Sequence, residues 1–185
     1  MAAHLYYVIG ASGAGKDSLL GYAREHMPLD MPVAFAHRYI TRAAASGDED
    51  HTSLSPDEFA LRLQHGCFAM HWESHGLSYG IGVEIRHWMQ QGLHVVLNGS
   101  RAYLDKAAAD FSNLVPVLIQ VDDAVLRKRL TGRGRESPDQ IAQRLRRNAE
   151  LRRSTAHPGL VRIDNNDELP AAGRQFLRLL AGETA

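Results

Sequence analysis

The stretch GASGAGKDS, residues 10–18, decides how the rest of the chain is interpreted. It completes the pattern G-x-x-x-x-G-K, in which glycines let backbone N–H groups approach a phosphate and the lysine supplies a positive charge. The apolar run LYYVI (5–9) before it is typical of a buried strand, and DSLLGYAREH (17–26) after it is typical of a helix. Strand, glycine loop and helix in this order predict phosphate binding, because the helix N-terminus adds partial positive charge.

The residue after the lysine departs from the usual pattern. A Ser or Thr at this position ligates Mg²⁺, but here it is Asp17. Either Asp17 holds the metal, or it caps the helix and Ser18 takes over that role. The residues that we expect to contact the nucleotide are Gly10, Ala11, Ser12, Gly13, Ala14, Gly15, Lys16, Asp17 and Ser18.

Further along the chain, apolar runs alternate with helical segments. The runs are LHVVLN (93–98), VPVLIQV (115–121) and GLVRID (159–164). Alternation of this kind predicts an α/β fold, with a parallel sheet and helices on both faces. The stretch 36–80 interrupts the alternation, and within it Ser55, Pro56 and Glu58 predict the start of a helix. The helices expected between the runs are 82–91, 101–110, 123–132, 138–155 and 167–180.

Composition predicts one globular domain, 1–185. The chain has 185 residues, no net charge and 44% hydrophobic residues. Its single cysteine, Cys67, excludes an internal disulfide framework, and we expect it to be a buried, small apolar residue. No signal peptide or membrane-length apolar run is present, so we expect a cytoplasmic protein without a membrane partner.

The segment 127–153 is strongly basic, with ten Lys and Arg residues against three acidic ones. Such a segment binds nucleic acid or closes over a small anion. It lacks the aromatic residues that stack on single-stranded bases, so we predict a small anionic ligand and no nucleic acid. Four of its arginines, Arg146, Arg147, Arg152 and Arg153, are expected to form a solvated helix face.

Several motifs together resemble the guanylate kinases and their P-loop relatives, in the same order and spacing over most of the chain. GASGAGKDSL is similar to their phosphate loop, and HRYITR (37–42) to the segment that grips the acceptor phosphate. RLTGRGRESPDQIAQRL (129–145) is similar to their arginine lid, and IDNND (163–167) to a loop near the adenine. The remaining matches are HTSLSPDEF (51–59), GCFAMHW (66–72) and HGLSYGI (75–81).

The departures from this family point to one branch. Guanylate kinases read guanine with a Glu before the Trp, where this chain has His71 before Trp72, and Asn98 stands where a strand-end Asp is expected. With GKDS, NGSR and GRGRE, the chain resembles the ribose 1,5-bisphosphate phosphokinases associated with phosphonate breakdown. The resemblance implies that ATP, with Mg²⁺, converts ribose 1,5-bisphosphate to 5-phosphoribosyl 1-diphosphate. Alternatives are a nucleoside monophosphate kinase, a non-catalytic protein-binding module and a nucleic-acid-binding protein.

The resemblance also implies an organisation and roles for individual residues. The core is 1–35, 81–127 and 154–185, the acceptor-binding region about 36–80 and the lid about 128–153. We expect the metal at Asp17, Ser18 and Asn98, and Asn166 near the nucleotide. Arg101 is nominated separately, because a second acceptor phosphate needs another cation. The residues expected to act in catalysis are Lys16, Arg133, Arg135 and Arg144, and those expected to bind the acceptor are Arg38, Arg42, Tyr79 and Arg101.

Overall fold

The computed structural model describes residues 2–43, 51–134 and 136–183, and these form two compact units. The first unit comprises residues 1–7 and 32–114, and the second comprises 8–31 and 115–185. Strand β1 (Leu5–Gly10) begins in the first unit and ends in the second. Arg135, one of the expected lid arginines, lies outside the described residues.

The first unit contains part of a parallel sheet, in the order β2-β7-β1. Strands β2 and β7 pair in parallel, with Val33 opposite His94 and Phe35 opposite Val96. The middle of β7 is fully buried, as its run of β-branched and aliphatic residues predicts. The elements are β2 (Val33–Phe35), α3 (Glu84–Gln90), β7 (His94–Asn98), the 3-10 turn η1 (Arg101–Tyr103) and α4 (Leu104–Asp110).

A second sheet in this unit is built from the stretch that interrupts the alternation. Its order is β4-β3-β6-β5, and β5 and β6 form an antiparallel hairpin. Helix α2 starts where the sequence predicts, because the Ser55 side chain accepts the backbone N–H of Glu58 and Pro56 is the first helical residue. The elements are β3 (Arg38–Ile40), β4 (His51–Ser53), α2 (Pro56–Gln64), β5 (Phe68–Ser74) and β6 (Leu77–Gly82).

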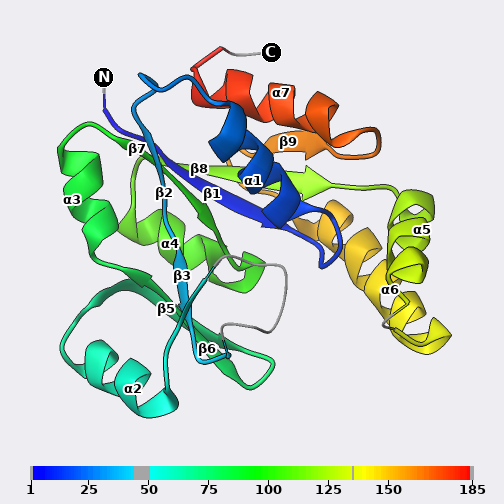
Figure 1. The fold of residues 1–185 in the computed structure, drawn as a ribbon, viewed down its shortest axis with the longest axis horizontal. Coiled ribbons are helices and arrows are strands. Elements are labelled where there is room, and N and C mark those ends of the chain that lie inside the picture. Colours follow the sequence, from blue (N-terminus) through cyan, green and yellow to red (C-terminus); the bar gives the residue numbers. More distant parts are fainter. Residues whose placement is uncertain (1, 44–50, 135, 184–185) are drawn as a thin grey trace. The chain divides into compact units, whose positions relative to one another are not determined.

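The second unit contains parallel strands in the order β1-β8-β9. Figure 1 shows α1 and α7 lying side by side in this unit. Gly173 allows this close packing, since a Cβ there would lie 2.2 Å from the Tyr22 ring. The elements are α1 (Lys16–His26), β8 (Leu114–Gln120), α5 (Asp123–Arg133), α6 (Pro138–Ser154), β9 (Val161–Asp164) and α7 (Leu169–Leu180).

The expected strands and helices are confirmed to within a few residues at each end, but one local prediction is wrong. Cys67 is exposed, because it lies in the short connection between α2 and β5 and not inside an element. Asp122 occupies the N-cap position of α5 without making a side-chain capping bond. Its carboxylate forms an ion pair of 3.1 Å with Arg152 instead. Within the described part of the chain, no helix is both long enough and apolar enough to cross a membrane.

Candidate active site

The phosphate loop in the second unit has the backbone that its glycines predict. Gly13 and Gly15 have φ angles of 92° and 86°, in the left-handed region that disfavours other residues. Gly10 is required by packing, because a Cβ there would lie 2.6 Å from the Ile119 carbonyl oxygen of β8. The amide of Ala14 donates to the Ala11 carbonyl at 3.1 Å and closes the turn. The sequence thus shapes a tight loop that opens onto the N-terminus of α1.

Lys16, the first residue of α1, folds back over this loop. Its Nζ donates to the carbonyl oxygens of Gly10 at 2.9 Å and Ala11 at 3.2 Å. These two hydrogen bonds hold the ammonium group beside the loop. A lysine in this place is a point charge that a phosphate can approach.

A second loop, after β9, braces the phosphate loop through Asn165. The Asn165 side chain is buried and donates to the Ala14 carbonyl at 2.7 Å, while its backbone N–H donates to Gln120 at 2.9 Å. Asn166, the residue expected near the nucleotide, accepts the backbone N–H of Asp122 at 2.7 Å. The structure therefore gives Asn165 a direct contact with the phosphate loop that the sequence did not indicate. The nucleotide role of Asn166 stays a prediction.

Arg129, on α5, is a second residue that the sequence analysis missed. Its Nη1 lies 3.8 Å from the position that a Cβ would take on Gly15, so the guanidinium lies beside the phosphate loop. That nitrogen is buried, and no described residue accepts a hydrogen bond from it. Burial, and then the nearby charge of Arg133, lowers the pKa of Arg129 from its usual value. An anion bound at the loop would compensate both effects, and arginine stays protonated at neutral pH.

The lid arginines differ in how closely they approach the loop. Arg144, on α6, donates from Nη1 to the Ser12 hydroxyl at 2.5 Å. Its Nη2 pairs with Glu136 at 2.9 Å. Arg133 is exposed at the end of α5, just before Gly134, and lies close enough to lower the pKa of Arg129. The structure therefore brings Arg144 to the phosphate loop, whereas Arg133 remains at the end of its helix.

Asp17 and Ser18 suit a Mg²⁺ ion held partly by phosphate. Both lie in the first turn of α1 directly after Lys16, and both side chains are exposed. Mg²⁺ prefers oxygen ligands, and it is usually bound through one or two carboxylates plus substrate phosphates and water. The oxygen atoms of this turn fit that pattern. Among the described residues, no group of three or more His, Cys, Asp or Glu side chains could hold a metal ion by itself.

In the first unit, aromatic rings and an arginine line the expected acceptor site. The Arg38 guanidinium lies 5.2 Å from the centre of the Tyr79 ring. Tyr79 stacks on Trp72 with centroids 5.5 Å apart and planes 2° apart, and Trp72 contacts Tyr103 at 5.7 Å. Because β3, β6 and β5 are neighbours, Arg38, Tyr79 and Trp72 lie on one sheet, and Tyr103 contacts Trp72 from η1. Arg38 therefore lies beside Tyr79, and the binding of one acceptor phosphate by both residues stays a prediction.

Arg42 follows β3 and contacts β4. Its Nη2 lies 3.4 Å from Nδ1 of His51, and its carbonyl oxygen accepts the Ser53 hydroxyl at 2.7 Å. The contact with Ser53 holds the backbone after β3, and the contact with His51 holds the Arg42 guanidinium beside β4. Arginine suits a phosphate here because its planar fork can form two parallel hydrogen bonds.

The segment after β7 is held by Tyr7. The Tyr7 hydroxyl donates to the Ser100 carbonyl at 2.9 Å and accepts the Ser100 N–H at 3.0 Å. Burial raises the pKa of Tyr7 well above its usual value, so the hydroxyl stays protonated. Only glycine fits at Gly99, because a Cβ would lie 2.2 Å from the Tyr7 ring. Asn98, at the end of β7, is buried. Arg101, at the start of η1, is exposed.

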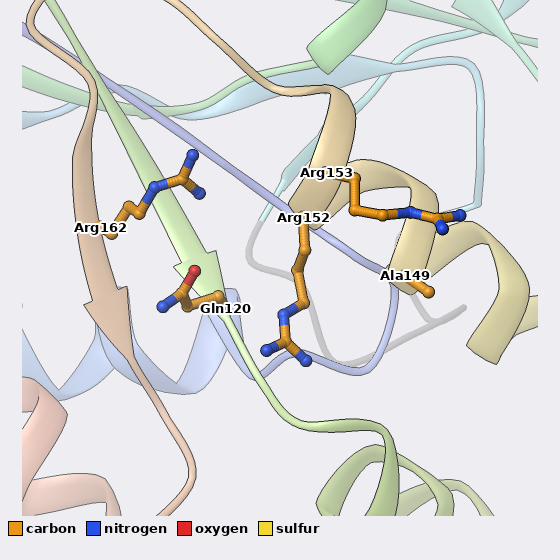
Figure 2. Close-up of a pocket in the computed structure, with 5 residues that line it drawn as sticks. All are labelled: Gln120, Ala149, Arg152, Arg153 and Arg162. Atoms are coloured by element: carbon orange, nitrogen blue, oxygen red, sulfur yellow. The ribbon is translucent and has the colours of Figure 1, made fainter.

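A pocket of about 440 Å³ in the second unit is lined by three arginines, Arg152, Arg153 and Arg162, together with Gln120 and Ala149. Figure 2 shows that Arg153 turns away from Arg152 and that the guanidinium of Arg162 points away from Gln120. Arg152 pairs with Asp122, and Arg162 donates to the Thr155 carbonyl at 3.1 Å. The three guanidinium groups do not converge on one point, so we assign no anion site here.

The fold and the phosphate loop define a P-loop α/β protein of the guanylate kinase type. Guanylate kinase from Anaplasma phagocytophilum superposes with a TM-score of 0.70 at 16% identity, covering 98% of this chain and 86% of that one. This likeness confirms the predicted fold class. No family model matches the chain.

Sequence relatives define the family. The chain is 51% identical, over 97% of its length and 90% of the relative, to ribose 1,5-bisphosphate phosphokinase PhnN of Psychromonas ingrahamii. Proteins of the same name from Thiobacillus denitrificans and Desulfomicrobium baculatum are 48% and 49% identical, over 98% and 97% of this chain and 94% and 95% of theirs. The chain therefore belongs to the ribose 1,5-bisphosphate phosphokinase family, a family of phosphotransferases, and the family predicted from the motifs is confirmed.

Proposed function

We propose that this chain transfers the γ-phosphoryl group of ATP to ribose 1,5-bisphosphate, giving ADP and 5-phosphoribosyl 1-diphosphate. The observation that carries the proposal is the near full-length identity of about half to proteins named for this substrate. The phosphate loop, with Lys16 and Arg144 beside it, agrees with ATP as the donor. We further propose a cytoplasmic enzyme that takes a small sugar phosphate and neither nucleic acid nor membrane as partner.

The chemistry suits the residues present. A phosphate monoester has a second pKa of about 6, so the acceptor oxygen is already mostly ionised at neutral pH. It attacks the γ-phosphorus, and the bond from the γ-phosphorus to the β,γ-bridging oxygen breaks as ADP leaves. The protein needs no general base and acts through alignment and charge neutralisation. We assign neutralisation to Lys16, Arg133 and Arg144, with Arg135 as a further candidate, and we add Arg129.

The acceptor carries two phosphate groups, so it needs several cations. We propose that Arg38, Arg42 and Tyr79 hold one phosphate, supported by the contact of Arg38 with Tyr79 and by the anchoring of Arg42 through its carbonyl oxygen. Arg101, exposed at the start of η1, is proposed for the other phosphate. We propose Asp17, Ser18 and Asn98 as candidates to hold Mg²⁺, which shields the charge of the triphosphate when bound.

The substrate assignment is tested by competition among acceptors. With ATP and Mg²⁺, ribose 1,5-bisphosphate is expected to be phosphorylated with a kcat/KM at least about 100-fold above that of GMP, about 2.7 kcal/mol of discrimination. The reason is that His71 replaces the carboxylate that reads guanine in the related kinases. Products are identified by ³¹P NMR against a panel of ribose phosphates and nucleoside monophosphates. A higher kcat/KM for GMP would establish the nucleoside monophosphate kinase alternative.

The role of Asp17 is tested through the metal. Asp17→Ser restores the usual hydroxyl and is expected to change the Mg²⁺ concentration for half-maximal turnover by about tenfold, with ATP saturating. The matched control is Asp30→Ser. Asp30 is an exposed aspartate in the loop after α1 and forms no hydrogen bond or ion pair with the described residues. An unchanged Mg²⁺ dependence in Asp17→Ser would assign Asp17 to the helix N-terminus only and leave the metal to Ser18.

A further inference from the structure

The turn between α5 and α6 holds a carboxylate to which the proposed reaction assigns no role. Glu136 pairs through Oε1 with Nη2 of Arg144 at 2.9 Å, and its side chain is only 12% exposed. Its other oxygen, Oε2, is buried and accepts no hydrogen bond from the described residues. Glu136 also lines a cavity of about 250 Å³, together with Arg127, Thr131, Pro138 and Ile141. Arg144 is therefore the cation that compensates this carboxylate.

Two described residues near Glu136, Gly134 and Ser137, have defined backbone roles at helix ends. Gly134 ends α5 with a φ of 62°, in the left-handed region. Ser137 begins α6 with a complete capping box, in which its hydroxyl accepts the Gln140 N–H and the Gln140 side chain accepts the Ser137 N–H. Glu136 directly precedes Ser137, the N-cap residue of α6. Its carboxylate therefore lies directly beside the capped start of α6.

Arg144 is held from two ends. Nη2 contacts Glu136 and Nη1 contacts the Ser12 hydroxyl of the phosphate loop. A guanidinium is planar, so fixing two of its nitrogens fixes the plane and leaves other N–H groups for a phosphate oxygen. Glu136 and an incoming phosphate can thus share Arg144 without competing for the same donors. The contact with Ser12 places the Arg144 guanidinium at the phosphate loop.

We infer that Glu136 is a positioning residue that holds the Arg144 guanidinium against the phosphate loop for phosphoryl transfer. The inference rests on the proposed function. A free arginine side chain samples many rotamers, and ordering it during the reaction would raise the barrier. The carboxylate orders it beforehand through a charge-assisted bond. The contribution of Glu136 therefore acts through Arg144 and on the turnover rate, more than on ATP affinity.

The experiment compares five proteins with ATP and ribose 1,5-bisphosphate: wild type, Glu136→Ala, Glu136→Gln, Arg144→Ala and the double variant Glu136→Ala/Arg144→Ala. Both kcat and the KM for ATP are measured, with thermal midpoints to confirm folding. Glu136→Ala is expected to lower kcat by about tenfold or more, with KM for ATP changed by less than about threefold. Glu136→Gln keeps the shape and an acceptor oxygen, so it is expected to recover part of the rate. The double variant is expected to match Arg144→Ala.

The matched control is Asp139→Ala. Asp139 lies in the first turn of α6, is exposed and forms no hydrogen bond or ion pair with the described residues, so the kcat of the variant should stay within about twofold of wild type. The inference is overturned if folded Glu136→Gln and Glu136→Ala both turn over at the wild-type rate. It is equally overturned if Glu136→Ala lowers kcat by the same factor with and without Arg144. Wild type that phosphorylates no acceptor would overturn the proposed function itself, which is a separate outcome.

Discussion

Lys16→Ala is expected to lower the phosphoryl transfer rate by about 10³-fold while the protein stays folded. The Lys16 ammonium is held at the loop by two carbonyl oxygens, where it can meet the β- and γ-phosphates. Its loss removes a positive charge that is already in place when negative charge shifts toward the leaving group. Steady-state turnover with ribose 1,5-bisphosphate and circular dichroism measure the two parts of the prediction.

Two further variants separate charge from structure. Lys16→Met keeps an unbranched stem without the charge and is expected to be as inactive as Lys16→Ala. Lys128→Ala removes an exposed lysine of α5 and is expected to leave turnover unchanged. A folded Lys16→Ala protein with wild-type turnover would contradict the assignment of this chain as a P-loop kinase.

Gly15→Ala is expected to weaken ATP binding by at least about tenfold and to reduce the free energy of unfolding by about 2 kcal/mol. At Gly15 φ is 86°, where an L side chain is strained, and a Cβ would lie 2.5 Å from Nδ2 of Asn165. The same Nδ2 donates to the Ala14 carbonyl, so the added methyl group displaces the brace of the phosphate loop. ATP titration by calorimetry and urea unfolding measure both effects.

Gly21→Ala is the matched control for this change. Gly21 lies inside α1, nothing approaches within 4 Å of an added Cβ, and alanine is the better helix former. This variant is expected to be more stable by about 1 kcal/mol and to bind ATP normally. If both glycine variants bind ATP as wild type does, the proposed dependence of the loop on Gly15 is wrong.

Local patterns were enough to predict the phosphate loop and the elements around it. The run before Gly10 and the helix after Lys16 follow from short-range preferences, and so does the start of α2 at Ser55. The family followed from several motifs in order, and the relatives confirm it. The roles of the individual site residues stay predictions, because each depends on contacts with ligands.

Other features needed distances that the sequence does not contain. Arg129 lies among basic residues with nothing local to distinguish it, and only the packing of α5 places its guanidinium beside Gly15. The adjacent residues Asn165 and Asn166 look equivalent in sequence, but one contacts the phosphate loop and the other contacts Asp122. In the sequence, Glu136 is one of three acidic residues in a basic segment. Its pairing with Arg144 depends on the position of α6, which the sequence does not give.

The two bonds of Lys16 to the loop carbonyls also bear on the catalytic cycle. A hydrogen bond from a charged group contributes about 1.5–3 kcal/mol, so a nucleotide that takes over the ammonium gains its phosphate contacts only in exchange for those bonds. The loop thus contains its own competitor for the lysine. On the proposed function, the carbonyl oxygens of Gly10 and Ala11 would accept hydrogen bonds from the ammonium group again when ADP departs. We therefore expect this exchange to moderate the affinity for donor and product alike.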